Sequence, residues 1–431
     1  MNKGMLATAL LALLPAAHAS ESDALAKHNA SLTAQVVEWR RHLHQHPELS
    51  NRETATAAYV AEHLRQLGLQ LTTGVAHTGV VALLDSGKPG PTVMLRADMD
   101  ALPVTEQVDL PFASTTKTTF RGQEVGVMHA CGHDAHVAIL MGVAQSLTQM
   151  KQQLNGKVLF VFQPAEEGAP EGEEGGAELM LKEGLFQRYQ PDVAFGLHVT
   201  SALPVGVIGM KSGPAMASAD RFVINVSGEQ THGSRPWNGA DPIVASANII
   251  NAVQTLVSRQ LDITKAPAVV SFGSIHGGVR SNIIPDQVEL VGTIRTFDEG
   301  MRAQIHQHLP EIAANSAASL GATAATTVEV GYPVTVNDPQ LSQWAMPYLA
   351  QHSSSEAVVN TGLITGAEDF SFFAQQVPGV YFFLGVTPQG QDPRHAPSNH
   401  SPKFYIDEAA LPVGVNALTQ LTLAQMNNPK L

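Results

Sequence analysis

Four runs of apolar residues along the chain have the length and composition of buried β-strands. They are rich in Val, Leu and Phe: TVMLRAD (92–98), KVLFVFQ (157–163), DVAFGLHV (192–199) and VYFFLGV (380–386). Between the first two lies AHVAILMGVAQSLTQM (135–150), whose pattern is typical of a helix. Buried strands that alternate with helices indicate a mostly parallel sheet with helices on both faces. The pattern therefore predicts an α/β fold.

The middle of the chain follows a different order of elements. We expect a strand, a helix, two strands, a helix and a strand, at 221–228, 241–260, 268–275, 287–297, 300–319 and 325–331. This β-α-β-β-α-β order is the ferredoxin-like arrangement. We therefore predict a large α/β domain, residues 20–214 and 329–431, that is interrupted by a smaller satellite domain, residues 215–328.

The N-terminal segment, MNKGMLATALLALLPAAHAS, has the features of a secretory signal peptide. Lys3 supplies a basic start, an apolar run follows, and Ala17-His18-Ala19 forms a small-x-small cleavage site. We expect residues 1–19 to be removed and the mature chain to be exported to the periplasm or secreted. No later run has the length and apolar character that a membrane span requires.

Charge and cysteine content narrow the set of partners. The formal net charge of −13 argues against nucleic acid and anionic membranes as partners. The chain contains one cysteine, Cys131, so it cannot form an internal disulfide. An unpaired thiol in an oxidising compartment is vulnerable unless something occupies it. A bound metal would be such an occupant.

Chemically active side chains occur where three of the predicted strands end. They are two aspartates, two glutamates and a histidine: Asp98, Asp100, Glu166, Glu167 and His198. A further segment, MHACGHDAH (128–136), directly precedes the helix expected at 135–150. In open parallel sheets the binding crevice lies outside the carboxyl ends of the strands. We therefore expect all these groups to meet at one edge of the sheet.

A thiolate, imidazoles and carboxylates together suit a metal ion, zinc or manganese first, with cobalt or nickel also possible. Cys131 and His133 are two residues apart, so in an extended chain both fall on one side. Glu166 and Glu167 point in different directions, so that one can bind metal while the other acts as general base. The competing interpretation is a helix cap at Asp134 beside ordinary histidines, with the glutamates on a solvated face.

Several segments in a fixed order connect the chain with a known family: LRADMDALP, MHACGHDAHVA, FQPAEEGAPEGEEGGAELM, FGLHV, SNIIPD, GAEDF and HSPKFYIDE. In this combination the chain resembles the dinuclear-metal amidohydrolase and carboxypeptidase family. Within it, the chain is most similar to the branch of hippurate hydrolases, auxin-conjugate hydrolases and N-acyl-amino-acid hydrolases. The family fold, a catalytic α/β domain with an inserted ferredoxin-like satellite domain, agrees with the pattern above.

The resemblance implies two divalent metal ions per subunit. It makes Cys131 the ligand that both ions share, and it implies four further ligands: His133, Glu167, His198 and His400. Glu166 is implied as the general base. Asp100 and Asp98 are implied as groups that orient a ligand histidine. A bridging role would explain why Cys131 is the single cysteine, and we expect it to oxidise easily without metal.

The resemblance also gives the satellite domain a role in a homodimer. In relatives, a satellite-domain histidine of the partner subunit helps to hold the scissile carbonyl oxygen, and His232 matches it by position. Asn282 matches a family asparagine, and Arg295 matches an arginine that grips the free carboxylate of the substrate. Asn282 could instead be a turn residue, and Arg295 a solvated strand residue. Trp237 stands where relatives often have a second histidine, which bears on the shape of the pocket.

The expected reaction is hydrolysis of the amide bond next to a free carboxylate, in N-acyl amino acids or short peptides. Two metal ions activate a water molecule, and Glu166 accepts its proton. A metal-dependent dipeptidase would share all these residues. Two rival functions belong to different classes: a cysteine hydrolase, in which Cys131 pairs with His133 or His129, and a non-catalytic binding protein on the same scaffold.

Overall fold

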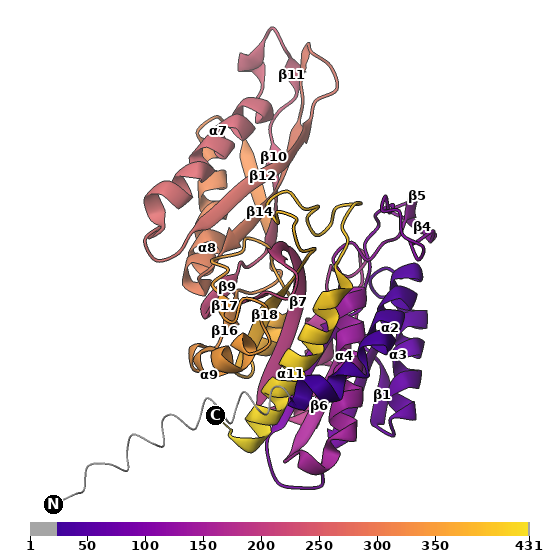
Figure 1. The fold of residues 1–431 in the computed structure, drawn as a ribbon. Coiled ribbons are helices and arrows are strands. Elements are labelled where there is room, and N and C mark those ends of the chain that lie inside the picture. Colours follow the sequence, from indigo (N-terminus) through magenta and orange to yellow (C-terminus); the bar gives the residue numbers. More distant parts are fainter. Residues whose placement is uncertain (1–23, 430–431) are drawn as a thin grey trace, which may run out of the picture. The chain divides into compact units, whose positions relative to one another are not determined.

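The computed structural model describes residues 24–429, and the predicted signal peptide lies outside them. The described chain forms two compact units, each with a hydrophobic core of its own (Figure 1). The first unit runs to Gly213 and includes Asn337–Gly362 and the chain from Phe373 onward; the second comprises Pro214–Val336 and Leu363–Phe372. The predicted satellite domain, 215–328, lies inside the second unit. That unit also contains residues 329–336 and 363–372, which the sequence pattern assigns to the large domain.

The first unit is built on an eight-stranded sheet with the order β1-β2-β6-β3-β7-β18-β8-β17. The strands are β1 (Gln70–Val75), β2 (Gly79–Asp85), β3 (Thr92–Asp98), β6 (Lys157–Gln163), β7 (Val193–Pro204), β8 (Ile208–Gly209), β17 (Val358–Val359) and β18 (Gly379–Thr387). The central strands β6, β3, β7 and β18 are parallel. β1 and β2 pair antiparallel with their neighbours, and β8 pairs antiparallel with β18 but parallel with β17. The predicted mostly parallel sheet is confirmed, and its central strands are the four apolar runs.

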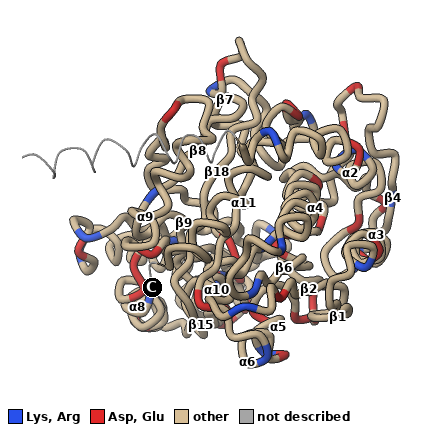
Figure 2. The backbone as a smooth tube through the Cα atoms, turned by 60° about the horizontal axis from the view of Figure 1, so that its bottom comes forward, with Lys and Arg blue, Asp and Glu red and all other residues tan. Residues whose placement is uncertain are grey.

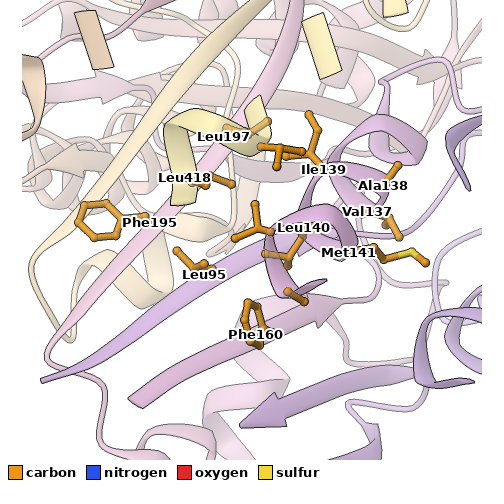
Figure 3. Packing of buried hydrophobic residues seen from close by; sticks show 14 of the residues in the cluster. Leu95, Val137, Ala138, Ile139, Leu140, Met141, Phe160, Phe195, Leu197 and Leu418 are labelled. Carbon is orange, nitrogen blue, oxygen red and sulfur yellow. The ribbon is translucent and has the colours of Figure 1, made fainter. Parts of the chain in front are cut away.

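Helices cover both faces of this sheet. On one face lie α2 (Thr33–Gln45), α3 (Thr54–Gln66), α4 (His133–Gln149) and α11 (Leu411–Asn427), and α9 (Pro339–Ala350) packs beside α11. The shorter α5 (Gly176–Lys182) and α6 (Leu185–Tyr189) lie on the other side of β2 and β6 (Figure 2). Figure 3 shows Leu95, Phe160 and Phe195 of three strands beneath Leu140 of α4 and Leu418 of α11. Burial of this apolar surface is the main force that holds the layers together.

The second unit contains the predicted β-α-β-β-α-β order: β10 (Asp220–Ser227), α7 (Pro242–Thr255), β12 (Ala268–Gly277), β14 (Gln287–Thr296), α8 (Glu299–Ala318) and β15 (Thr323–Glu329). Its antiparallel sheet has the order β12-β14-β10-β15, which is the ferredoxin-like topology. Asp241 and Asp298 begin the two helices by accepting hydrogen bonds from backbone amides of the first turn. Strand β12 lies at an edge of this sheet.

The described chain also contains short elements, among them β4 (Lys117–Phe120), β5 (Gln123–Gly126), β9 (Gly213–Met216), β11 (Thr231–His232), β13 (Ile283–Ile284), β16 (Thr335–Asn337) and α10 (Phe370–Ala374). Between residues 24 and 429, no helix combines the length and the apolar character needed to cross a bilayer.

Candidate metal centre

The topology of the first unit brings the predicted ligands to one edge of the sheet. β3 ends at Asp98, β6 ends three residues before Glu166, and His198 lies within β7. Because β3 pairs in parallel with both β6 and β7, the carboxyl ends of these strands lie side by side. His133 is the first residue of α4, so its side chain also faces this edge.

The bend before α4 requires a glycine. Gly132 has a φ of +93°, and a Cβ atom there would lie 2.3 Å from Cγ2 of Val199. Both the left-handed backbone and the close approach exclude larger residues. Cys131 and His133 are therefore brought together by a tight bend. This corrects the expectation of an extended segment between them.

Cys131 lies at the centre of the cluster. Its Sγ atom is 3.3 Å from Nε2 of His198 and 3.2 Å from Nε2 of His400, and this second imidazole nitrogen is 3.1 Å from Oε1 of Glu167. The possible ligand atoms form two groups: Cys131 with His133 and His198, and Cys131 with Glu167 and His400. Within each group, all the ligand atoms lie within 4.8 Å of one another. The sulfur atom belongs to both groups, as a bridging ligand must.

Glu166, the predicted general base, lies close to the predicted ligands His133 and Glu167. Nε2 of His133 is 3.8 Å from Oε2 of Glu166 and 3.9 Å from Oε1 of Glu167. These three residues form a further group of close donor atoms. Glu166 is almost fully buried in the turn that follows β6.

The donor set and its spacing fit divalent metal ions. Two donor atoms that bind one zinc ion at about 2.0–2.3 Å are about 3–4 Å apart, and the separations around Cys131 and His133 fall in this range. A thiolate, imidazoles and a carboxylate would serve zinc, manganese, cobalt or nickel. The five predicted ligands thus converge, with Glu166 next to them.

Asp100 connects His133 to the backbone amides of Glu166 and Glu167. Its Oδ1 atom is 3.3 Å from Nδ1 of His133 and accepts a hydrogen bond from the amide of Glu166 at 3.1 Å. Its Oδ2 atom accepts bonds from the amide of Glu167 at 3.0 Å and from the hydroxyl of Ser50 at 2.7 Å. This arrangement agrees with the predicted orienting role of Asp100.

Asp98 has a different partner from the one expected. It lies 2.5 Å from Nδ1 of His136, whereas Nδ1 of the ligand His133 is 3.8 Å away. The other ring nitrogen of His136 accepts the amide of Val199 at 2.8 Å. Asp98 is also 2.6 Å from the Arg96 guanidinium. Its closest hydrogen-bond partner is therefore a neighbour of the ligands rather than a ligand.

Burial and local charge shift the pKa of the ligands in the metal-free protein. Burial, and then the charges of Glu167 and Glu166, raise the pKa of the Cys131 thiol well above its usual value. Burial alone would lower the pKa of His133, but Asp98 and Asp100 raise it to about 10. Without metal, Cys131 is therefore a protonated thiol with low reactivity. Its expected easy oxidation without metal stays a prediction.

Asp134 does not cap α4, contrary to the competing interpretation of MHACGHDAH. The N-cap residue of the helix is Gly132, and Asp134 lies inside the first turn. Instead its Oδ2 atom lies 2.7 Å from Nε of Arg40 and 2.8 Å from Nδ1 of His44. These three buried groups form an ion network that joins α2 to α4.

Glu53 and Asn399 are neighbours of the site that the sequence did not reveal. Glu53 accepts a hydrogen bond from the amide of Ala165 at 2.9 Å, and Ala165 has a positive φ of 52°. Asn399 donates to the carbonyl groups of Cys131 at 2.9 Å and Val199 at 3.0 Å. The position of Asn399 directly before the predicted ligand His400 could have identified it as a neighbour of the site. The sequence around α3 contains no feature that identifies Glu53 in this way.

The three remaining predicted residues belong to the second unit. His232 lies on the exposed strand β11, where its Nδ1 atom accepts the amide of Ser234 at 3.1 Å. Asn282 lies next to it, because its carbonyl accepts the amide of Gly233 at 2.8 Å. Arg295 is half-buried on β14, and burial lowers its pKa. The roles of His232, Asn282 and Arg295 stay predictions.

A model of peptidase family M20/M25/M40 matches residues 94–424. The chain belongs to this family. It is 42% identical over 394 residues to thermostable carboxypeptidase 2 of Saccharolobus solfataricus, covering 91% of this chain and 95% of that protein. It is 36% identical over 382 residues to N-acetyl-L-cysteine deacetylase of Bacillus subtilis, covering 89% and 86%.

A solved structure of a Bacillus subtilis protein, described as a dinuclear metal binding peptidase from the M20 family, has the same fold. Its TM-score is 0.77 with 34% sequence identity, and the match covers 92% of this chain and 99% of that one. These likenesses bear out the resemblance seen in the sequence. This M20-family chain is therefore a metal-dependent hydrolase that acts on amide bonds.

The raised pKa of Glu53 predicts a pH-dependent loss of stability in the metal-free M20-family protein. Burial, and then the charge of Asp100, raise the pKa of Glu53 to about 7, whereas the unfolded value is about 4.3. Between these values the folded state keeps a proton that the unfolded state has lost. The free energy of unfolding therefore falls as the pH rises through this window. Glu53→Gln keeps an acceptor for the Ala165 amide but carries no charge, so this part of the fall should vanish.

Urea unfolding with EDTA at about pH 5 and about pH 8 measures the effect. The matched control is Glu178→Gln, which removes an exposed carboxylate of α5. An equal loss of stability in wild type and Glu53→Gln would show that Glu53 is not the source.

Proposed function

We propose that this chain hydrolyses the amide bond next to a free carboxylate in N-acyl amino acids or short peptides, with two divalent ions in the site. The observation that carries this proposal is the shared position of Cys131 between two ligand groups, with Glu166 beside them. The names of the relatives, a carboxypeptidase and an N-acetyl-L-cysteine deacetylase, support a substrate of this class. A dipeptidase would use the same site.

Cys131, His133, Glu167, His198 and His400 would hold the ions. Bound there, the ions would supply Lewis acidity, which polarises a carbonyl group and makes water a stronger acid. Glu166 accepts the proton of the attacking water and passes it to the leaving nitrogen. Asp100 positions this carboxylate, because it binds the amides of both glutamates in the turn.

Substrate recognition is assigned to the second unit. Arg295 grips the free carboxylate of the substrate, a task that suits a guanidinium. Asn282 and His232 are adjacent in the second unit, which supports a joint role at the carbonyl group. His232 acts from the partner subunit and stabilises the oxyanion.

The alternative function, that of a cysteine hydrolase, has less support than the proposed metal-dependent hydrolysis. A cysteine nucleophile requires a thiolate at neutral pH, which a low pKa provides. In this chain, burial and nearby carboxylates raise the pKa of Cys131 well above its usual value. Its hydrogen-bond contacts are with His198 and His400, which the proposal assigns as metal ligands.

The edge strand of the second unit supports a homodimer. Strand β12 has an open edge, and Val269 and Ile275 on it are 42% and 54% exposed. On the nearby start of α7, Ile243 and Val244 are 45% and 52% exposed. An open strand edge with exposed apolar side chains is a surface on which another chain can pair. We further propose export, which rests on the signal-peptide features of residues 1–19.

Glu166→Gln should lower kcat by about 10²–10⁴-fold, because the variant has no group that accepts the proton. Its metal content should stay near that of wild type, since Glu166 is not one of the proposed ligands. Steady-state kinetics on N-acetyl amino acids and elemental analysis measure the two quantities. Glu174→Gln, which changes an exposed glutamate of the same loop, is the control. Full activity in Glu166→Gln would remove this residue from the role of base.

Removal of divalent ions should abolish hydrolysis, because the ligand cluster would then lack Lewis acidity. Dialysis against EDTA, followed by addition of zinc, manganese, cobalt or nickel, should restore the rate with at least one of these metals. Protein dialysed without EDTA is the control. Undiminished activity of metal-free protein would favour a cysteine hydrolase instead.

Mixing two inactive variants should restore activity if His232 acts in the partner's site. His232→Ala and Glu166→Gln, refolded or exchanged together, form mixed dimers in which one site has both groups intact. Activity should return to at most about a quarter of wild type, since half of the dimers are mixed and each has one intact site.

The control pairs Glu166→Gln with Cys131→Ala, both of which alter the catalytic unit. The site built from the Cys131→Ala catalytic unit lacks the bridging ligand, and the other site lacks the base, so no activity should return. Failure of His232→Ala to recover activity in mixed dimers would rule out a role of His232 in trans.

A further inference from the structure

One of the proposed metal ligands, His400, lies in a loop rather than in a helix or a strand. The loop comprises residues 388–407, between β18 and the short turn of 3₁₀-helix at Glu408–Ala410. The His400 side chain is 55% exposed, and its backbone has a positive φ of 71°. A left-handed backbone is costly for a residue other than glycine. Contacts with the rest of the first unit must therefore hold His400 in this conformation.

The side chain of Asn399, directly before His400, makes three contacts of this kind. Its Nδ2 group donates hydrogen bonds to the carbonyl groups of Cys131 at 2.9 Å and Val199 at 3.0 Å. Its Oδ1 atom accepts the backbone amide of Ser201 at 3.3 Å. One amide group thus joins the loop to the bend that carries Cys131 and to strand β7.

Two neighbouring contacts act in the same direction as those of Asn399. The backbone amide of His400 donates to the carbonyl of Ala130 at 2.8 Å. Phe404, four residues further along, is buried in the core of the first unit. Together these contacts bring Nε2 of His400 to 3.2 Å from Sγ of Cys131.

The other two histidine ligands are held by regular secondary structure. His133 begins α4 and is fully buried, and His198 lies in β7, which pairs with β18. Side chains on helices and strands are held more precisely than side chains on loops. The ligand group of Cys131, His133 and His198 is therefore preformed. The group of Cys131, Glu167 and His400 is complete only while the loop holds His400 in place.

We infer that Asn399 is a positioning residue for one of the two ions: it fixes His400, and so sets the affinity for the ion that Cys131, Glu167 and His400 would hold. This inference rests on the proposed function with its two ions. Groups that orient metal ligands contribute about 10–100-fold to metal affinity. Removal of the Asn399 amide should weaken the binding of this ion by that factor, whereas the affinity of the preformed group should change by less than about twofold.

Asn399→Ala tests the inference, because it removes all three contacts. Metal-free protein is titrated with zinc at fixed pH in competition with a chromophoric chelator, and elemental analysis after dialysis counts the ions. We expect two bound ions in wild type, and in the variant one ion of unchanged affinity and one that binds about 10–100-fold more weakly. The matched control is Asn360→Ala, which changes an exposed asparagine that accepts the amide of Gly362 at 2.9 Å. It should match wild type for both ions.

Asn399→Asp provides a second variant of nearly the same size. Its carboxylate can still accept the amide of Ser201, but it has no hydrogen to donate to the carbonyl groups of Cys131 and Val199. The same selective loss of one ion is expected. This variant keeps the test decisive if Asn399→Ala does not fold.

Combination with His400→Ala separates positioning from a general effect on the fold. If Asn399 acts through His400, then Asn399→Ala should change metal affinity by less than about twofold in a protein that already has His400→Ala. A general effect on the fold would persist in the double variant. Cobalt gives a spectroscopic check. The first equivalent should produce the same thiolate-to-cobalt absorption in Asn399→Ala as in wild type, because Cys131 still binds that ion.

Three results would overturn the inference: equal weakening of both ions, unchanged affinity for both ions in Asn399→Ala and Asn399→Asp, or an effect of Asn399→Ala that persists without His400. Failure of the proposed function itself gives a different result. In that case wild type would bind fewer than two ions, or the loaded protein would hydrolyse none of the N-acyl amino acids or short peptides.

Discussion

The structure of the site depends on the buried carboxylate of Asp100. This one group faces the ring of His133 and accepts the hydroxyl of Ser50 and the amides of Glu166 and Glu167. It therefore fixes the ring of His133, a proposed metal ligand, and the turn that carries Glu167, another proposed ligand, and Glu166, the proposed base. A buried carboxylate is stable only when its oxygens are bonded in this way. The chemistry of the neighbouring side chains depends on a group that need not touch substrate.

Several buried carboxylates lie at the same edge of the sheet, and their negative charges need positive partners to be stable in the protein interior. Arg96 and His136 offset Asp98, and the negative charges around His133 raise its pKa to about 10. At neutral pH the metal-free site therefore holds a proton on His133 that a metal ion would replace. Divalent ions offset such a cluster of carboxylates more completely than protons do. The excess of acidic groups at this edge is itself an argument for a metal centre.

The sequence predicts those features that local patterns encode. Runs of apolar residues gave the central strands, and the positions of Asp98 and Glu166 at strand ends gave the edge where the site lies. Glu53 could not be found in this way, because it meets Ala165 only when the sheet forms, 112 residues along the chain. The boundary of the second unit after Val336, and its extra segment Leu363–Phe372, also result from packing between distant parts of the chain. Periodicity reveals which residues are buried, but it does not reveal which distant residues they meet.

The protonation of the single cysteine, Cys131, makes metal binding depend on pH. Cys131 is only 6% exposed, and the carboxylates of Glu167, Glu166 and Asp98 all favour its protonated form. Only a thiolate binds metal, and a coordinating ion supplies the positive charge that removes the proton. Uptake of metal therefore releases a proton from Cys131, and the affinity for metal falls as the pH falls. With an ion the sulfur is bound, and without one it is a buried, protonated thiol.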